Sequence, residues 1–247
     1  MRTLALDIGN TAVKYGCFDG DVLLETAVVA GVDQVSEVLE RLRPRHVIVS
    51  SVAEATAGWV AQWQQQVSGR VLEFGPATTP LPIRNAYATP HTLGADRLAA
   101  AVGAAWLWPT RSTLIIDAGT AIKCDWVEDG HTFRGGSIAP GLRLRFEALH
   151  TFTGRLPLVA MPTDPAAPLP LTGTDTQAAI RSGVLNGAVA EVNGFIEAYR
   201  AQHPGLQVVL AGGDAGFFQP RLKGRIFVIP ELVLIGLHRI LVHNVEN

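Results

Sequence analysis

The chain has little cysteine, little net charge and no long apolar run. Its two cysteines, Cys17 and Cys124, lie in strand-like runs and are too few for a disulfide framework, and no zinc-site spacing accompanies them. The formal net charge of −2 excludes a strong global attraction to nucleic acid or to an anionic membrane. No run of about 18 apolar residues occurs, so no membrane-spanning helix is expected.

No targeting segment is recognisable, because the chain enters a strand-like run at once and Asp7 interrupts it. Together with the unpaired cysteines, this predicts a cytoplasmic protein. The apolar content of 48% and the charged content of 17% are typical of a chain that folds around a core. A length of 247 residues allows one large domain or two smaller ones.

Two similar motifs stand 110 residues apart. Residues 7–11 read DIGNT and follow an apolar run, and residues 117–121 read DAGTA and follow another. Each motif places a carboxylate, a ligand for a hard cation, at a strand end. The glycine lets the backbone approach phosphate oxygens, and the neighbouring hydroxyl, amide and N–H groups can donate to them. The pair therefore indicates a duplicated domain with a nucleotide between its halves.

The expected elements repeat in the same order. In the first half we expect strands at 3–7, 12–18 and 21–29, a helix with apolar positions 35, 38, 39 and 42, a strand at 46–50, a short helix around 59–63 and a strand at 70–74. In the second half we expect strands at 113–117, 121–127 and 131–137, a helix at 175–200 capped by Thr174 or Asp175, a strand at 207–210 and a last helix at 231–241.

We expect residues 94–108, which are rich in alanine, to form a helix that bridges the two halves. The whole order resembles the α/β, duplicated actin-like (ribonuclease H-like) ATPase fold, with two similar domains and a nucleotide cleft between them. We expect the domains to be residues 1–110 and 111–247. The stretch 156–170 contains five prolines and is expected to be a surface loop, with a possible part in closing over substrate.

Five motifs in order along the chain resemble type III pantothenate kinases. Besides the two above they are YATP at 87–90 with LGADR at 93–97, GGSIAPG at 135–141, and GTDT at 173–176 followed by IRSG at 180–183. The LGADR and GGSIAPG motifs distinguish this family from other actin-like ATPases, which in general lack them. The fold alone would not indicate a substrate.

The resemblance implies ATP-dependent phosphorylation of pantothenate to 4'-phosphopantothenate, the first step of coenzyme A biosynthesis. It implies a homodimer, with a surface on the 183–200 helix and a substrate pocket completed by the partner subunit. It implies Mg²⁺ at Asp7, a monovalent cation (K⁺ or NH₄⁺) at Asp117, and Asp96 as the proton acceptor. It assigns ATP to Asp7, Ile8, Gly9, Asn10, Thr11, Ala12, Val13, Lys14 and Thr120, and pantothenate to Tyr87, Gly94, Ala95, Asp96, Arg97 and Thr176.

Each role has a plainer structural alternative. Asp96 and Arg97 can act as general base and as anion-binding fork, or they can form an ion pair that caps a helix. Asp7 or Asp117 taken singly could cap a turn. Two other functions also stay open: a different actin-like phosphotransferase, and a non-catalytic regulatory relative. The acidic pI of about 6.4 argues against direct DNA binding.

Lys123 departs from the family pattern, because many members have threonine there. Its ammonium could point toward Asp117 or the phosphates and partly replace the monovalent cation. The alternative is a lysine that points into solvent at a sheet edge.

Overall fold

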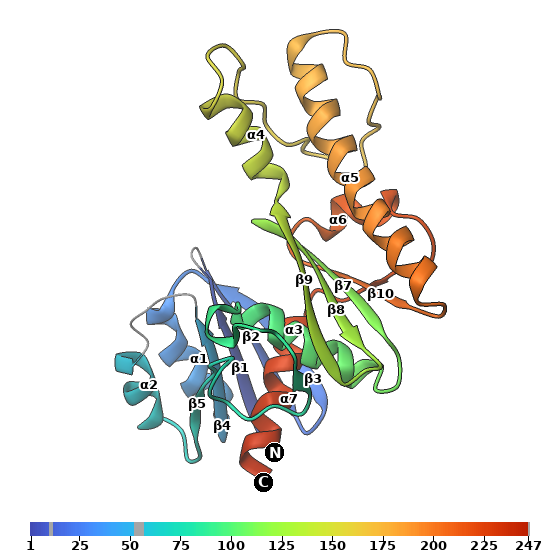
Figure 1. Cartoon of the computed structure of the whole chain (residues 1–247). Coiled ribbons are helices and arrows are strands. Elements are labelled where there is room, and N and C mark those ends of the chain that lie inside the picture. Colours follow the sequence, from blue (N-terminus) through green and yellow to red (C-terminus); the bar gives the residue numbers. More distant parts are fainter. Residues whose placement is uncertain (10–11, 52–56, 247) are drawn as a thin grey trace. The chain divides into compact units, whose positions relative to one another are not determined.

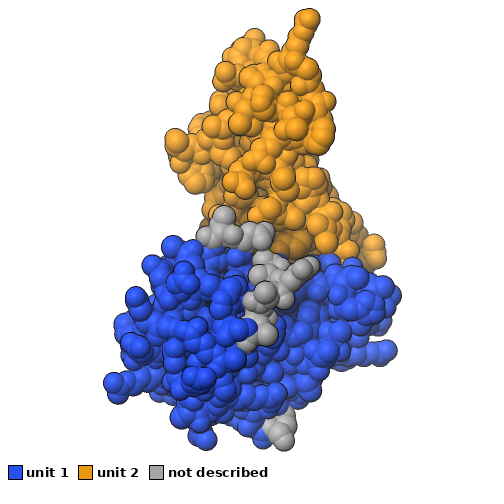
Figure 2. Space-filling model, turned by 90° about the vertical axis from the view of Figure 1, so that its left-hand side faces the viewer, with its two compact units in different colours: residues 1–110, 127–134, 231–247 blue, residues 111–126, 135–230 orange. Residues whose placement is uncertain are grey.

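The computed structural model describes residues 1–9, 12–51 and 57–246. The chain forms two compact units, coloured separately in Figure 2. The first unit comprises residues 1–110, 127–134 and 231–247, and the second comprises residues 111–126 and 135–230. Residues 127–134 and the C-terminal helix thus pack with the first unit. The predicted division into domains of residues 1–110 and 111–247 stays a prediction.

The first unit is built on a sheet of strand order β3-β2-β1-β4-β5 (Figure 1). Strands β1, β2 and β3 pair antiparallel, whereas β1, β4 and β5 pair parallel. The strands β1 and β4 are buried along most of their length, as expected of central strands covered on both faces. Their bounds are β1 Arg2–Ile8, β2 Val13–Asp19, β3 Val22–Val29, β4 His46–Ser51 and β5 Val71–Glu73.

The helices of the first unit are α1, Val35–Leu42; α2, Ala57–Gln64; α3, Ala95–Leu107; and α7, Leu232–Glu246. Helix α1 buries Val35, Val38, Leu39 and Leu42, the four positions that its sequence periodicity predicts. Short 3₁₀ turns occur at Val32–Gln34 and Pro90–Thr92. The expected bridging helix at 94–108 is α3, one residue shorter at each end.

Helices α3 and α7 pack against each other through glycines. A Cβ on Gly103 would overlap the carbonyl oxygen of Leu232, and one on Gly236 would overlap the carbonyl oxygen of Ala99. Only glycine permits so close an approach of two helix backbones. Helix α7 also packs on β1 and β4, so the C-terminal end of the chain completes the core of the first unit.

The second unit repeats the strand order of the first. Read from β9, its strands follow the order β9-β8-β7-β10-β11, which places the third, second, first, fourth and fifth strands of this half as in β3-β2-β1-β4-β5. Strand β10 pairs parallel with both β7 and β11. The short strand β6, Arg84–Asn85, pairs with the start of β9. The bounds are β7 Thr113–Ala118, β8 Ala121–Glu128, β9 Thr132–Pro140, β10 Gln207–Ala211 and β11 Phe227–Val228. The expected duplicated fold is confirmed.

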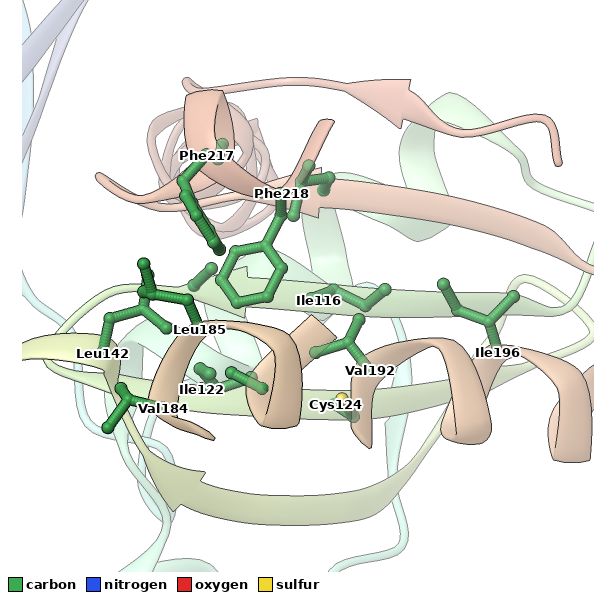
Figure 3. Close-up of a cluster of buried hydrophobic side chains, with 14 of the residues drawn as sticks. Ile116, Ile122, Cys124, Leu142, Val184, Leu185, Val192, Ile196, Phe217 and Phe218 are labelled. Carbon is green, nitrogen blue, oxygen red and sulfur yellow. The ribbon is translucent and has the colours of Figure 1, made fainter. Parts of the chain in front are cut away.

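The helices of the second unit are α4, Leu142–Thr151; α5, Thr176–Gln202; and the short α6, Ala215–Phe218, followed by a 3₁₀ turn at Gln219–Arg221. Asp175 caps α5 by accepting a hydrogen bond from the backbone N–H of Ala178 at 2.8 Å. The apolar stripe of α5 packs on the sheet with Phe217 and Phe218 (Figure 3). That stripe is therefore core, and only the opposite face of α5 is exposed.

Two outcomes concern segments between these elements. The sequence did not predict helix α4, whose opening Leu-Arg-Leu-Arg alternates like a strand. In the structure the helix buries Leu142 and Phe146, too few residues to give a clear apolar stripe. The Pro-rich stretch 156–170 contains no helix or strand, as expected. Arg221 holds that stretch by donating to the carbonyl oxygens of Pro165 and Ala167.

In the described part of the chain, no helix is long and apolar enough to cross a membrane.

Candidate active site

Asp7 lies at the end of β1, in the first unit. Its Cα is paired with Lys14 of β2 and Ser50 of β4. The backbone N–H of Gly9 donates to the carbonyl oxygen of Ala12 at 3.1 Å, which links the end of β1 to the residue before β2. The carboxylate is therefore presented at the carboxyl end of a central strand, where ligands of α/β sheets are commonly bound.

The other residues of this motif that are predicted to bind ATP differ in how far they are exposed to solvent. Ile8 and Val13 are 5% and 1% exposed and belong to the core of the first unit, so they can meet a nucleotide only through backbone groups. Lys14 is exposed on β2, whereas Ala12 is half-buried. Asn10 and Thr11 lie outside the described residues.

Asp117 holds the equivalent place at the end of β7, in the second unit. Its Oδ2 lies 2.7 Å from the Nζ of Lys123, which comes from the neighbouring strand β8. Gly212, at φ 91°, is the residue after β10. Its backbone lies so near Asp117 that a Cβ there would be 2.5 Å from Oδ1 of Asp117. The backbone N–H of Asp214 donates to the carbonyl oxygen of Ala118 at 2.8 Å. The end of β7 is thus enclosed by β8 and by the glycine turn after β10.

The turn after Asp117 is held by the GGSIAPG motif. Gly119 N–H donates to the carbonyl oxygen of Ala121 at 3.1 Å, and Gly141 N–H donates to that of Thr120 at 3.0 Å. A Cβ on Gly141 would overlap the carbonyl oxygens of Gly119 and Thr120. The side chain of Thr120 is exposed. The DAGTA and GGSIAPG motifs are therefore packed backbone to backbone, and this contact holds the main chain at Thr120.

Asp96 and Arg97 open helix α3 in the first unit. Oδ1 of Asp96 accepts a hydrogen bond from the backbone N–H of Arg97 at 2.9 Å. Gly94 leaves room for this carboxylate, since a Cβ there would lie 2.6 Å from Oδ1. Ala95 and Asp96 are both half-buried. A carboxylate in the first helical turn is also favoured by the helix dipole.

Arg97 is 5% exposed, although arginine is rarely buried without partners. Its guanidinium carbon lies 5.5 Å from the ring centroid of Tyr87 and 5.9 Å from that of Phe133. These two rings are themselves 6.1 Å apart. The sequence singled out Tyr87 but missed Phe133, whose only local signal was its place in an alternating strand.

Thr176, expected to bind substrate, is the exposed first residue of α5 in the second unit. Gly173 lies against the start of the same helix, because a Cβ there would overlap the backbone of Ala179. In the same unit, burial raises the pKa of Asp214, and it raises the pKa of the Cys124 thiol to about 12. Cys124 is thus an ordinary buried thiol, as its strand-like context predicts.

The fold defines the class of protein first. A Baf family transcriptional activator from Campylobacter jejuni aligns with a TM-score of 0.65 at 19% identity, over 99% of this chain and 100% of that one. A ROK hexokinase from Thermus thermophilus aligns with a TM-score of 0.55 at 15% identity, over 99% and 100%. At such low identity these likenesses show the fold alone, which is that of the actin-like and sugar-kinase ATPases.

Sequence comparison then gives the family. The model of type III pantothenate kinases matches residues 3–198. The type III pantothenate kinase of Cytophaga hutchinsonii is 44% identical over 242 residues, which are 98% of this chain and 99% of that protein. The chain belongs to the type III pantothenate kinase family, whose members are kinases that phosphorylate pantothenate in coenzyme A biosynthesis.

Proposed function

We propose that this chain transfers a phosphoryl group from ATP to the primary hydroxyl of pantothenate, with Asp96 as the residue that takes the proton. The observation that carries the proposal is the start of α3, where a half-buried carboxylate is held by Arg97 N–H beside a buried guanidinium. A carboxylate within hydrogen-bond reach of a hydroxyl can orient it and accept its proton. Asp96 also satisfies one N–H of the first helical turn, because Gly94, the cap residue, has no side chain that could accept it.

Arg97 is proposed to bind a carboxylate or amide oxygen of pantothenate. The Tyr87 and Phe133 rings fix its guanidinium, so little side-chain entropy is lost when a ligand arrives. With 5% of Arg97 exposed, a ligand reaches only a small part of the guanidinium. Arg97 is therefore proposed to select a ligand by the position of its oxygen as well as by the charge of that oxygen.

The phosphate side of the reaction is proposed to rest on the two strand-end motifs. Asp7 has the chemistry of a Mg²⁺ ligand, since this ion is commonly bound by one or two carboxylates together with substrate phosphates. Mg²⁺ on the nucleotide neutralises charge on the phosphate oxygens. The exposed hydroxyl of Thr120 is proposed to donate to the phosphates, whereas the N–H groups of Gly9 and Gly119 already donate to the carbonyl oxygens of Ala12 and Ala121.

The test is an ADP-release assay run with and without pantothenate, with the product identified by its mass. We expect ADP release that depends on pantothenate and yields the phosphorylated acid. ADP release that pantothenate does not change would favour another actin-like phosphotransferase. Nucleotide binding with no turnover on pantothenate would favour a regulatory relative.

We further propose that the chain acts as a homodimer through the exposed face of α5. Gly183, Gly187 and Gly194 lie on that face, and a Cβ on any of them would meet nothing within 4 Å. Such a smooth face lets a second helix approach closely. Phe152 and Leu171, in the same unit, are each 84% exposed, which is unusual for large apolar side chains.

The exposed Thr176 at the start of α5 would then contribute to a substrate pocket completed by the partner subunit. Sedimentation of the purified chain should give the mass of a dimer. Gly187→Glu should shift it toward the monomer, whereas Gly58→Glu, on the exposed side of α2, should not. We place the activity in the cytoplasm, where thiols such as Cys17 and Cys124 stay reduced.

A further inference from the structure

Lys123 and Asp117 form an ion pair at the proposed phosphate site. Nζ of Lys123 lies 2.7 Å from Oδ2 of Asp117, and the two side chains are 16% and 19% exposed. The pair is therefore largely withdrawn from water and weakly screened by salt. By contrast, the Lys223–Glu197 pair spans 3.2 Å with side chains 73% and 60% exposed, the ordinary state of a surface pair.

Both charges of the pair come from one sheet of one compact unit. Asp117 ends β7, and Lys123 stands on the adjacent strand β8. A strand backbone on each side fixes the separation of the two Cα atoms, so the ammonium is held near the carboxylate by the fold itself. Of the two alternatives that the sequence left for Lys123, the structure supports the one in which it points toward Asp117.

A monovalent metal ion does not fit this carboxylate as these residues arrange it. Oδ2 of Asp117 faces the ammonium of Lys123. Oδ1 lies beside the backbone at Gly212, where a side chain on any other residue would crowd it. An additional cation at Asp117 would stand close to a fixed positive charge of the same sign, and the repulsion grows as the site loses water.

The ammonium can supply the charge that such an ion would bring. A carboxylate beside the Gly119 turn repels phosphate oxygens unless a cation compensates it. Lysine carries a compact point charge, which resembles a small monovalent cation more closely than the broad, planar guanidinium does. A tethered charge also needs no binding from solution, so it is present at any concentration of potassium.

We propose that Lys123 is the built-in monovalent cation of this site and makes the enzyme independent of added potassium or ammonium. The inference rests on the proposed function, because it concerns the charge around the ATP phosphates. It concerns the second unit alone and does not depend on which residue takes the proton.

The test compares wild type, Lys123→Thr and Lys223→Thr in KCl and in choline chloride at constant ionic strength, which holds screening fixed. ADP release by the wild type and by the Lys223→Thr control should change less than about twofold between the two salts. Lys123→Thr should lose roughly 10²–10³-fold in kcat in choline chloride, the range seen when one electrostatic stabiliser is removed. Potassium should restore much of that loss.

Thermal unfolding of the same three proteins gives a readout that needs no turnover. Potassium should raise the melting temperature of Lys123→Thr above its value in choline chloride, since an ion that binds the folded state stabilises it. It should leave the wild type and Lys223→Thr unchanged. Strong activation or stabilisation of the wild type by potassium would overturn the proposal, and this arm requires no variant to fold.

An equal response of Lys123→Thr to the two salts, in both rate and melting, would overturn the proposal as well. Absence of ADP release from every protein in both salts would count against the proposed function instead. The melting comparison would then still decide whether Lys123 occupies the place of a monovalent ion.

Discussion

The substitution Asp96→Asn distinguishes a catalytic role of the Asp96 carboxylate from a purely structural one. Asparagine has nearly the same size and keeps an oxygen that can accept the hydrogen bond from Arg97 N–H, now 2.9 Å long. The variant loses the negative charge in the first turn of α3, a stabilisation of about 0.3–1 kcal/mol. For a chain of this length the melting temperature should therefore fall by no more than about 4 °C.

The effect on turnover should be far larger. Loss of a general base lowers kcat by about 10²–10⁴. That loss equals about 2.7–5.4 kcal/mol of barrier, several times the expected loss of stability. Nucleotide affinity should change little, because the phosphates are proposed to bind at the strand-end motifs instead.

The assay is steady-state ADP release with saturating ATP and pantothenate, joined to a thermal melt of the same preparation. Glu37→Gln is the matched control, because it removes a carboxylate from the first turn of α1 and should leave kcat unchanged. If Asp96→Asn kept near-wild-type kcat, Asp96 would be a helix-start residue and the proposed base would be wrong.

Two further substitutions and one pH dependence test other parts of the structure. Asp7→Ala should abolish turnover while calorimetry still detects pantothenate binding, because Asp7 is proposed to act only on the metal and phosphates. Gly236→Ala should lower the free energy of unfolding by about 1–3 kcal/mol or more, since its Cβ overlaps the Ala99 carbonyl oxygen. Gly58→Ala, with open space around its Cβ, should be neutral or slightly stabilising. The pH dependence of stability should carry the signature of His238, whose pKa is lowered to about 4 by burial and by Arg239 and is partly offset by Asp21.

The sign of that last effect follows from proton binding. The unfolded chain takes up the His238 proton near its ordinary pKa of 6.5, whereas the folded chain does so near 4. Stability is therefore present above pH 6.5 and falls by about 3 kcal/mol as the pH drops toward 4. Urea unfolding at pH 7 and pH 5 should show a smaller drop for His238→Asn than for the wild type.

Each of these three predictions has a contrary result. Turnover by Asp7→Ala at ordinary Mg²⁺ levels would reduce the first motif to a turn. An unchanged unfolding energy for Gly236→Ala would mean that α3 and α7 do not meet at that glycine. Equal pH slopes for the wild type and His238→Asn would show that His238 does not resist protonation.

Local patterns in the sequence determined much of this protein. The periodicity of α1, a cap of α5 at Thr174 or Asp175 and the succession of strands along each half depend on neighbours close in the chain, so they can be read from spacing alone. The motifs at 93–97 and 135–141 similarly carried the family, because they are contiguous runs of residues.

Tertiary structure decided whatever depends on distant segments meeting. The sequence left Lys123 pointing either way, and the choice required the place of β8 beside β7. Phe133 joined Tyr87 around Arg97 because strand β9 passes there, and nothing near Phe133 in the sequence indicates it. The C-terminal helix α7 packs on β1 through contacts more than 200 residues apart, such as the 2.9 Å hydrogen bond between Thr3 and His238. Periodicity shows which face of a helix or strand is buried, but the partner that covers that face is selected only when the whole chain packs.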